Sequence, residues 1–225
     1  MRDNRCSAIL LDALGTLVEL QPPAPRLRRL LAAEGFEISE ERAGAGFRAE
    51  IAYYLEHHLE GSDRERLADL RDRCATTMMQ ALELPGLDHE TARRVMLGSL
   101  EFIPYPDALE ALPVLRERGH ALVVVSNWDC SLPDWLRAAG LLELVDGVIT
   151  SADAGVAKPG LGMFESALEL ARARPEHAVH VGDSIENDVQ GARGAGIRPI
   201  LISREGESPG GIETVTALTE VPALV

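Results

Sequence analysis

Polar side chains follow several apolar runs of this sequence, at positions typical of a catalytic site. Each alone has an ordinary explanation as a helix cap, a turn residue or a solvated charge. If the apolar runs are parallel strands of one sheet, their carboxyl ends place these side chains at a single edge, where ligands bind. The residues concerned are Asp12, Gly15, Thr16, Ser126, Asn127, Lys158, Asp183 and Asp188.

The residue types in this set are suited to phosphoryl transfer. Asp12 and Asp183 can share a divalent cation, because Mg²⁺ prefers oxygen ligands and needs few protein carboxylates. The Asp12 carboxylate can also act as a nucleophile and form an aspartyl intermediate. Hydroxyl groups of Thr16 or Ser126 and the ammonium group of Lys158, the only lysine of the chain, can bind the oxygens of the transferred group. Phosphoryl transfer depends mainly on such positioning and charge neutralisation.

The elements that must position these residues follow an alternating pattern. We expect a first strand over residues 7–14 and further strands in "HALVVVSN", "DGVITS", "EHAVHVGDS" and "IRPILIS", with helical patterns between them, including one in "ENDVQGARGAG". Continuous Val, Ile and Leu runs are typical of parallel strands covered by helices on both faces. The fold class is therefore α/β with a doubly wound parallel sheet. Asp107 is expected to cap a helix that extends to about Arg118.

A second region lies between the first strand and the rest of the sheet. After a proline cluster at residues 21–25, the segment from Arg26 to about Glu101 shows apolar residues at three- and four-residue spacing and no strand-like run. Gly35, Gly61 and the pair Pro85-Gly86 divide this region into roughly four helices. We expect an inserted all-α domain over 21–101 and an α/β core formed by 1–20 and 102–225.

Composition limits the partners that this chain can bind. Its 225 residues have a formal net charge of −14, which disfavours nucleic acid and anionic membrane surfaces. No apolar run approaches the length of a membrane span or a signal peptide. The three cysteines, Cys6, Cys74 and Cys130, are scattered, which is typical of reduced thiols in the cytoplasm. We expect a cytoplasmic monomer or homodimer that acts on a small molecule.

The ordered set of motifs resembles the haloacid dehalogenase (HAD) superfamily of hydrolases. "DALGTL" is similar to its first motif, "VVVSN" to its second, "AKPGLGMF" to its third and "VGDSIENDVQGARGAG" to its fourth. The helical insertion resembles the C1-type cap of that superfamily. The resemblance implies a Rossmann-like core with an inserted cap, and Mg²⁺-dependent hydrolysis of a small phosphorylated metabolite through an aspartyl-phosphate.

The resemblance also implies a role for each residue at this edge. Asp12 corresponds to the nucleophile, and the cation is expected between the carboxylates and one backbone carbonyl. The implied catalytic residues are Asp12, Thr16, Ser126 and Lys158, the substrate-binding residues are Gly15 and Asn127, and the metal ligands are Asp12, the carbonyl of Leu14, Asp183 and Asp188.

Leu14 departs from the pattern of the phosphatases that this chain resembles. Those enzymes place a second Asp two residues after the nucleophile as a general acid and base, a role typically worth about 10²–10⁴-fold in rate. The 2-haloacid dehalogenases lack it because halide leaves without a proton, but they bind no metal and lack the carboxylate that corresponds to Asp183. Phosphonoacetaldehyde hydrolases need a lysine in the cap, and residues 21–101 contain none.

Three functions therefore remain open: a phosphatase that either is weakly active or acts on an easily displaced leaving group such as that of an acyl phosphate, a 2-haloacid dehalogenase, and a phosphometabolite-binding protein without turnover. A group of phosphatase-like proteins with "DAxGTL" and "SNWD" motifs is the most similar. Asp129 in "SNWDCS" is a candidate substitute acid, with a helix N-cap as the alternative. Several residues of the insertion either line a substrate cleft or pack within the helices: Phe47, Arg48, Tyr53, Tyr54, His57 and His58.

Overall fold

The computed structural model describes residues 6–206 and 210–225 and separates into two compact units. The first, here called the core unit, comprises Met1–Glu19 and Pro104–Val225. The second, the helical unit, comprises Leu20–Ile103. Each unit is described by itself below.

The core unit is built on a six-stranded sheet in the order β5-β4-β1-β6-β7-β8, in which every described pairing is parallel. This sheet and the inserted helices confirm the predicted α/β fold class. Because β1 pairs with both β4 and β6, the ends of these three strands lie next to one another. The strands are β1 (Ala8–Leu11), β4 (Ala121–Ser126), β5 (Gly147–Thr150), β6 (Ala178–Gly182), β7 (Arg198–Ile202) and β8 (Thr214–Val215).

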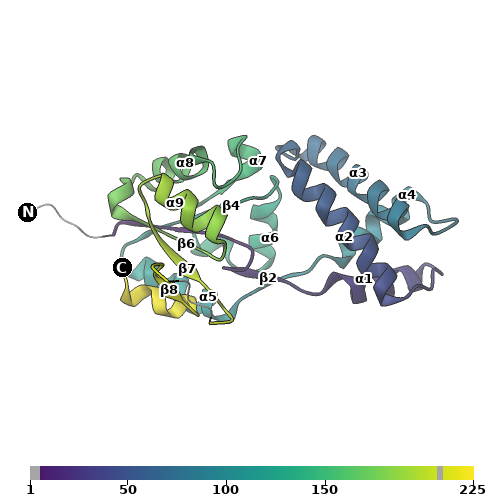
Figure 1. Ribbon diagram of the computed structural model, residues 1–225, viewed down its shortest axis with the longest axis horizontal. Coiled ribbons are helices and arrows are strands. Elements are labelled where there is room, and N and C mark those ends of the chain that lie inside the picture. Colours follow the sequence, from purple (N-terminus) through teal and green to yellow (C-terminus); the bar gives the residue numbers. More distant parts are fainter. Residues whose placement is uncertain (1–5, 207–209) are drawn as a thin grey trace, which may run out of the picture. The chain divides into compact units, whose positions relative to one another are not determined.

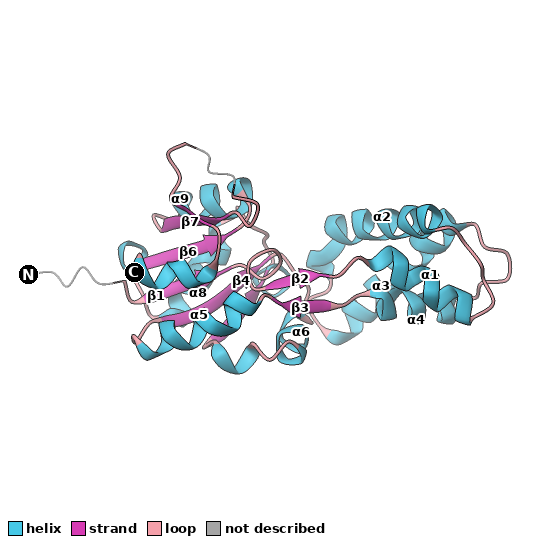
Figure 2. Cartoon of the chain, turned by 90° about the horizontal axis from the view of Figure 1, so that it is seen from below, coloured by secondary structure: helices cyan, strands magenta, loops and turns pink. Residues whose placement is uncertain are grey.

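Helices cover both faces of the sheet, which explains the continuous apolar runs. Helix α8 (Leu161–Ala171) lies on one face and α5 (Pro106–Glu117) on the other, as Figures 1 and 2 show. On the α8 side, Leu10 packs in a buried cluster with Phe164. All four residues of β1 are fully buried. A strand covered on both faces has no solvent-facing positions, so its sequence does not alternate.

The first strand is shorter than predicted, because the chain turns directly after Asp12. The backbone N–H groups of Thr16, Leu17 and Val18 all donate to the carbonyl of Ala13. The strand therefore ends at Leu11, and a tight turn follows it.

The helical unit contains four α-helices, in agreement with the periodicity of its sequence. Three of them begin at residues whose side chains accept a hydrogen bond from the backbone N–H three residues later: Ser39, Asp63 and Asp88. Such N-caps satisfy donors that the first turn of a helix leaves unpaired. The helices are α1 (Pro23–Ala33), α2 (Glu40–His57), α3 (Arg64–Leu82) and α4 (His89–Ser99).

A short two-stranded sheet was not predicted. It consists of β2 (Val18–Leu20) and β3 (Phe102–Pro104). Each strand has only three residues, and β3 ends in a proline, so neither gives a recognisable strand pattern. The pairing joins segments that are distant in sequence, which local periodicity does not report.

The prediction for Asp107 was wrong. Helix α5 begins at Pro106 and follows Tyr105, so Asp107 lies inside the first turn. Its carboxylate instead accepts hydrogen bonds from Arg204 and from the backbone N–H of Leu218. An acidic residue in a first helical turn is also favourable toward the helix dipole, so the sequence alone did not separate the two arrangements.

The predicted helix after β6 has an irregular start. A π-helical turn over Ile185–Gln190 precedes the short helix α9 (Gly191–Gly194). The side chain of Ser184 accepts a hydrogen bond from the N–H of Asn187 and caps this turn. π-Helical turns often occur at functional sites, and this one contains Asp188.

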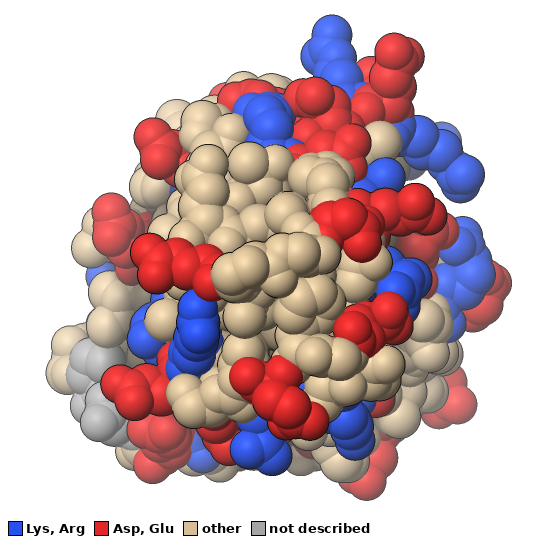
Figure 3. Space-filling view, turned by 90° about the vertical axis from the view of Figure 1, so that its right-hand side faces the viewer, with Lys and Arg blue, Asp and Glu red and all other residues tan. Residues whose placement is uncertain are grey.

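Two further observations concern the helices and the surface. Within residues 6–206 and 210–225, no helix is long and apolar enough to cross a membrane. On the face drawn in Figure 3, acidic and basic side chains are interspersed around an uncharged central area, rather than separated by sign.

Candidate active site

Asp12 lies at the carboxyl end of the central strand and is buried, with 6% of its surface exposed. Its backbone N–H donates to the carbonyl of Val181 at 2.9 Å, which continues the pairing of β1 with β6. Its Oδ1 atom accepts a hydrogen bond from Ser126 Oγ at 2.9 Å and another from Lys158 Nζ at 2.6 Å. Both contacts use the same oxygen, so Oδ2 is the oxygen of Asp12 that remains for other chemistry.

Lys158 is a buried cation shared by two carboxylates. Its Nζ atom lies 2.6 Å from Asp12 Oδ1 and 2.6 Å from Asp188 Oδ1. Asn127 fixes the backbone at this position, because its Oδ1 accepts from the N–H of Lys158 at 2.7 Å and its Nδ2 donates to the carbonyl at 3.1 Å. Asn127 thus holds the segment that bears the lysine.

Asp188 is held from three sides. Beside Lys158, His180 Nε2 lies 2.9 Å from Asp188 Oδ1, and the N–H of Ser184 donates to Oδ2 at 2.9 Å. His180 is fully buried in β6, with its ring edge-on to Phe164. The sequence analysis did not single out His180, although a histidine within the apolar run "AVHVG" was a usable signal.

Asp183 and Gly15 lie against each other at this edge. A Cβ atom added to Gly15 would be 2.3 Å from Asp183 Oδ2, and Gly15 has a φ of +81°. Any larger residue would be strained and would clash with the carboxylate. Ligand atoms of Asp12, Asp183 and Asp188 all lie within 4.8 Å of one another. The structure thus brings together the three acidic residues that the sequence analysis selected as metal ligands.

The charges at this edge shift the pKa values of the acidic groups. Burial raises the pKa of Asp12, against the effect of Lys158. Partial burial and repulsion from Asp12 and Asp188 raise the pKa of Asp183 to about 6. Burial alone would raise the pKa of Asp188, but Lys158 and His180 hold it below its ordinary range. Although burial disfavours an ammonium ion, Asp12 and Asp188 raise the pKa of Lys158.

The charge of this cluster favours a divalent cation. Three carboxylates and one ammonium group leave two negative charges when all are ionised. Oxygen ligands at this spacing are the donor set that Mg²⁺ prefers. The residues present therefore fit a magnesium ion.

Three other selected residues are not joined to this cluster by described contacts. The side chain of Leu14 is exposed, with 43% of its surface accessible. Thr16 is fully buried, and its Oγ1 has no hydrogen-bond partner among the described residues. Asp129 is not the N-cap of α6 (Leu132–Ala138), because Ser131 is at that position; the Asp129 Oδ1 atom instead accepts a hydrogen bond from the N–H of Ser131 at 2.7 Å.

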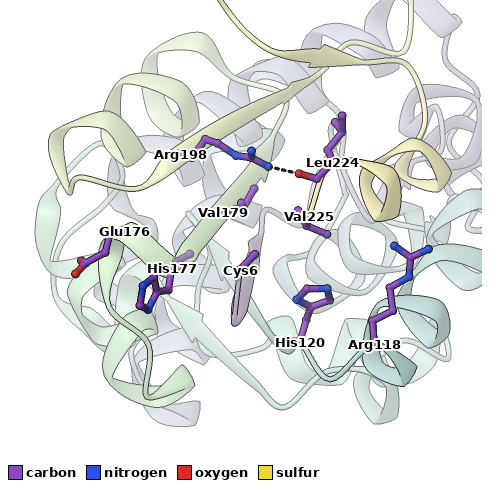
Figure 4. Close-up of a pocket in the computed structure, with 10 residues that line it drawn as sticks. Cys6, Arg118, His120, Glu176, His177, Val179, Arg198, Leu224 and Val225 are labelled. Carbon is purple, nitrogen blue, oxygen red and sulfur yellow. Dashed lines mark hydrogen bonds between the residues drawn. The ribbon is translucent and has the colours of Figure 1, made fainter. Parts of the chain in front are cut away.

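A cavity lies at the edge of the sheet opposite to Asp12. Its volume is about 560 Å³, and Figure 4 shows the side chains that surround it. Cys6, His120, His177 and Arg198 precede or begin the strands β1, β4, β6 and β7. None of the residues selected from the sequence lines it. A smaller cavity of about 390 Å³ borders Gly15 and Asp183.

Comparisons with known proteins support one family. The sequence profile of the haloacid dehalogenase-like hydrolases matches residues 6–196. The chain is 45% identical over 97 residues to haloacid dehalogenase-like hydrolase domain-containing protein 3 of Xenopus laevis, covering 43% of this chain and 40% of that protein. It is 35% identical over 104 residues to glyceraldehyde 3-phosphate phosphatase of Methanothermobacter thermautotrophicus, covering 45% and 46%. The chain thus spans less than half the length of these relatives.

Solved structures resemble the chain over nearly its whole length. A HAD phosphatase from Thermococcus onnurineus is 26% identical with a TM-score of 0.64, covering 97% of each chain. An L-2-haloacid dehalogenase from Xanthobacter autotrophicus is 21% identical with a TM-score of 0.72, covering 97% of each chain. The second likeness concerns the fold alone.

Proposed function

Because this chain belongs to the family of haloacid dehalogenase-like hydrolases, we propose that it hydrolyses a small phosphorylated metabolite through an aspartyl-phosphate at Asp12. The observation on which the proposal rests is the buried Asp12 carboxylate, bound through one oxygen to Ser126 and Lys158 and grouped with Asp183 and Asp188. The relative from Methanothermobacter thermautotrophicus acts on glyceraldehyde 3-phosphate, which supports a small phosphorylated metabolite as the substrate class, although the alkoxide that this relative's substrate releases needs a proton.

Asp12 supplies the nucleophile in this proposal. Ser126 and Lys158 fix Oδ1, so Oδ2 attacks the phosphorus atom and the bond to the leaving oxygen breaks. Water then attacks the aspartyl-phosphate, which releases inorganic phosphate and regenerates the Asp12 carboxylate. Lys158 keeps a positive charge on Oδ1, the other oxygen of the reacting carboxylate, throughout both steps.

Magnesium is the proposed cofactor. Asp12, Asp183 and the carbonyl of Leu14 would hold the Mg²⁺ ion, and Asp188 would support these ligands. The bound ion would neutralise negative charge on the phosphoryl oxygens. Ser126, Lys158 and Thr16 are proposed to bind the phosphoryl oxygens, and Gly15 lets the Asp183 carboxylate approach the first turn.

The substrate is proposed to have a leaving group that needs no proton. Leu14 provides an exposed apolar side chain at the position where the phosphatases of this family have an acid. An acyl phosphate releases a carboxylate, which is stable without protonation. An alkyl phosphate releases an alkoxide and depends on general acid catalysis.

The test is release of phosphate from acetyl phosphate, from p-nitrophenyl phosphate and from an alkyl phosphate, each with Mg²⁺ and with EDTA. We expect turnover with Mg²⁺ in the order acetyl, aryl and alkyl phosphate, and no turnover with EDTA. Phosphate release that persists in EDTA contradicts the metal assignment. Binding of phosphate esters without any turnover supports the alternative of a non-catalytic binding protein.

A 2-haloacid dehalogenase remains the second candidate, because Leu14 suits a halide leaving group. The presence of Asp183 beside Asp12 argues against it, since a cation site is not needed for halide displacement. Chloride release from 2-chloropropionate that is insensitive to EDTA would favour this candidate over the phosphatase.

A further inference from the structure

Arg204, two residues after β7, donates two hydrogen bonds to the turn that follows Asp12. Its Nε donates to the carbonyl of Gly15 at 3.1 Å, and its Nη2 donates to the carbonyl of Thr16 at 2.6 Å. These two residues directly follow Leu14, whose carbonyl is a proposed metal ligand. Arg204 therefore binds the backbone of the catalytic turn without belonging to any of the motifs quoted above.

The guanidinium group is itself held in place. Its Nη1 donates to Asp107 Oδ1 at 3.2 Å and to Oδ2 at 3.0 Å, and Asp107 Oδ2 also accepts from the N–H of Leu218 at 2.6 Å. The guanidinium carbon lies 3.4 Å from the centre of the Tyr105 ring, a cation–π contact. Arg204 is thus fixed by a carboxylate and an aromatic face while its remaining donors reach the turn.

The position of this turn decides the space available to Asp183. The Gly15 backbone packs so closely on Asp183 that a Cβ atom would be 2.3 Å from the carboxylate. A small displacement of the turn changes the separation between Asp183 and the residues that follow Asp12. Contacts that hold such a segment act on a metal site as outer-shell partners do, which typically affect affinity or activity by about 10–100-fold.

We propose that Arg204 is a positioning residue, which holds the Gly15–Thr16 turn so that Asp12, Asp183 and the Leu14 carbonyl can share one cation. This inference rests on the proposed function for its catalytic consequence, but the contact with the turn is independent of it. Lysine is a poor substitute, because a single ammonium group cannot reproduce the planar set of donors of a guanidinium group.

The cavity beside Arg204 offers a way to rescue its loss. It has a volume of about 390 Å³, and Gly15, Tyr105, Asp183 and Arg204 are among the residues that line it. Truncation to alanine opens this cavity toward the turn and leaves the Asp107 carboxylate without its cationic partner, with only the N–H of Leu218 still donating to it. Free guanidinium ion can then enter and bind Asp107 and the two carbonyl groups.

The experiment compares Arg204→Ala with Arg204→Lys and a matched control. Arg198→Ala is the control, because Arg198 begins the same strand and also donates to a backbone carbonyl, that of Leu224 at 2.6 Å, at the opposite edge of the sheet. Three readouts are measured in the full chain: Mg²⁺ affinity by calorimetry, amide hydrogen exchange of residues 15–18, and phosphate release with and without millimolar guanidinium.

Arg204→Ala is expected to weaken Mg²⁺ binding and to lower kcat/KM by about 10–100-fold, with faster exchange at residues 15–18 and partial rescue by guanidinium. In Mg²⁺ affinity, amide exchange and phosphate release, Arg204→Lys is expected to be intermediate between Arg204→Ala and the wild type. Arg198→Ala is expected to match the wild type in all three measurements. Unchanged exchange at residues 15–18 in Arg204→Ala overturns the inference whether or not the protein is a phosphatase. If exchange at residues 15–18 is faster in Arg204→Ala as expected, but the wild type releases no phosphate, the proposed function is refuted and the positioning role stands.

Discussion

Carboxyl groups are buried in both units, and among the described residues two of them, both in the core unit, have a described cationic partner. Asp12 and Asp188 share the ammonium group of Lys158, which lies 2.6 Å from each. In the helical unit, Glu50 of α2 is 5% exposed, and its Oε2 has no hydrogen-bond partner among the described residues. Burial raises the pKa of Glu50 to about 7, against a hydrogen bond with Cys74.

The presence or absence of a nearby cation affects whether a buried carboxyl group is ionised. A carboxylate without a nearby positive charge regains its proton when it is buried, since the charged form loses its hydration. A buried cation between two carboxylates favours their ionised forms: Lys158 and His180 hold the pKa of Asp188 below its ordinary range, and Lys158 opposes the rise that burial causes in the pKa of Asp12. Such arrangements cluster at functional sites. Glu50 can be explained by packing between helices, whereas the Asp12 cluster needs a functional explanation.

The strongest test of this contrast is the same carboxyl-to-amide change at both places. Asp12→Asn removes the proposed nucleophile and is expected to lower kcat for acetyl phosphate by about 10³-fold or more. Glu50→Gln is the matched control, and its kcat is expected to stay within about twofold of the wild type, since surface and packing changes away from the site do not alter the chemistry. Phosphate release is measured under saturating Mg²⁺. Wild-type turnover in Asp12→Asn contradicts the assignment of the nucleophile.

The second prediction concerns the buried cation. Lys158→Met leaves Asp12 and Asp188 without their shared partner, and loss of one member of a buried ion pair typically destabilises by about 3–5 kcal/mol. Arg137→Ala is the control, because its pair with Asp134 has the same 2.6 Å separation but is exposed, and such pairs contribute about 0–1 kcal/mol. The free energy of unfolding is measured in urea without added metal. Equal losses in the two variants show that burial of the lysine pair does not matter.

The third prediction uses the pH dependence of stability. The pKa of Glu50 is about 7 in the folded protein and about 4.3 for an unperturbed Glu, so the folded state binds the proton more tightly. Glu50 therefore lowers stability as pH rises through this interval, by up to about 4 kcal/mol at pH 8. Glu50→Gln is expected to be more stable than the wild type at pH 8, with the advantage largely absent at pH 4.

The control for this pH dependence is Glu56→Gln, an exposed position on the same helix. Its stability curve is expected to parallel that of the wild type in urea unfolding between pH 4 and pH 8. A Glu50→Gln curve that is also parallel shows that the Glu50 carboxyl is hydrated in solution and removes the contrast with Asp12.

The two sites were not equally predictable from the sequence. Asp12 and Asp183 follow apolar runs, and strands of a parallel sheet end at the same edge, so their proximity follows from the strand pattern. Glu50 is one acidic residue in an amphipathic helix, and its spacing does not distinguish a buried from an exposed position. Periodicity finds a helix but does not report which side chains from other helices cover it.

Contacts between distant segments explain the other failures. Asp107 was expected to cap its helix because only its neighbours were visible in the sequence, whereas its partners are Arg204 and Leu218. The pairing of β2 with β3 likewise joins the two ends of the helical insertion. A single sequence indicates where chemistry is possible. It does not indicate which side chains, distant along the chain, hold the reacting groups in place.

The smallest effect is expected from a substitution that adds a carboxyl group to the core site instead of removing one. Leu14→Asp places an acid two residues after Asp12, at a position that is 43% exposed, so the new group remains hydrated and can exchange protons. General acid catalysis is worth about 10²–10⁴-fold in rate when the acid is well placed. Because the surrounding residues are not adjusted to the new acid, Leu14→Asp alone is expected to raise kcat for an alkyl phosphate by only roughly tenfold. Its kcat for acetyl phosphate is expected to change little. Leu14→Asn has nearly the same size but no acidic proton, so it is expected to give no gain. A gain that is equal for both substrates, or equal in the Asn variant, shows that Leu14 limits access to the site rather than proton transfer.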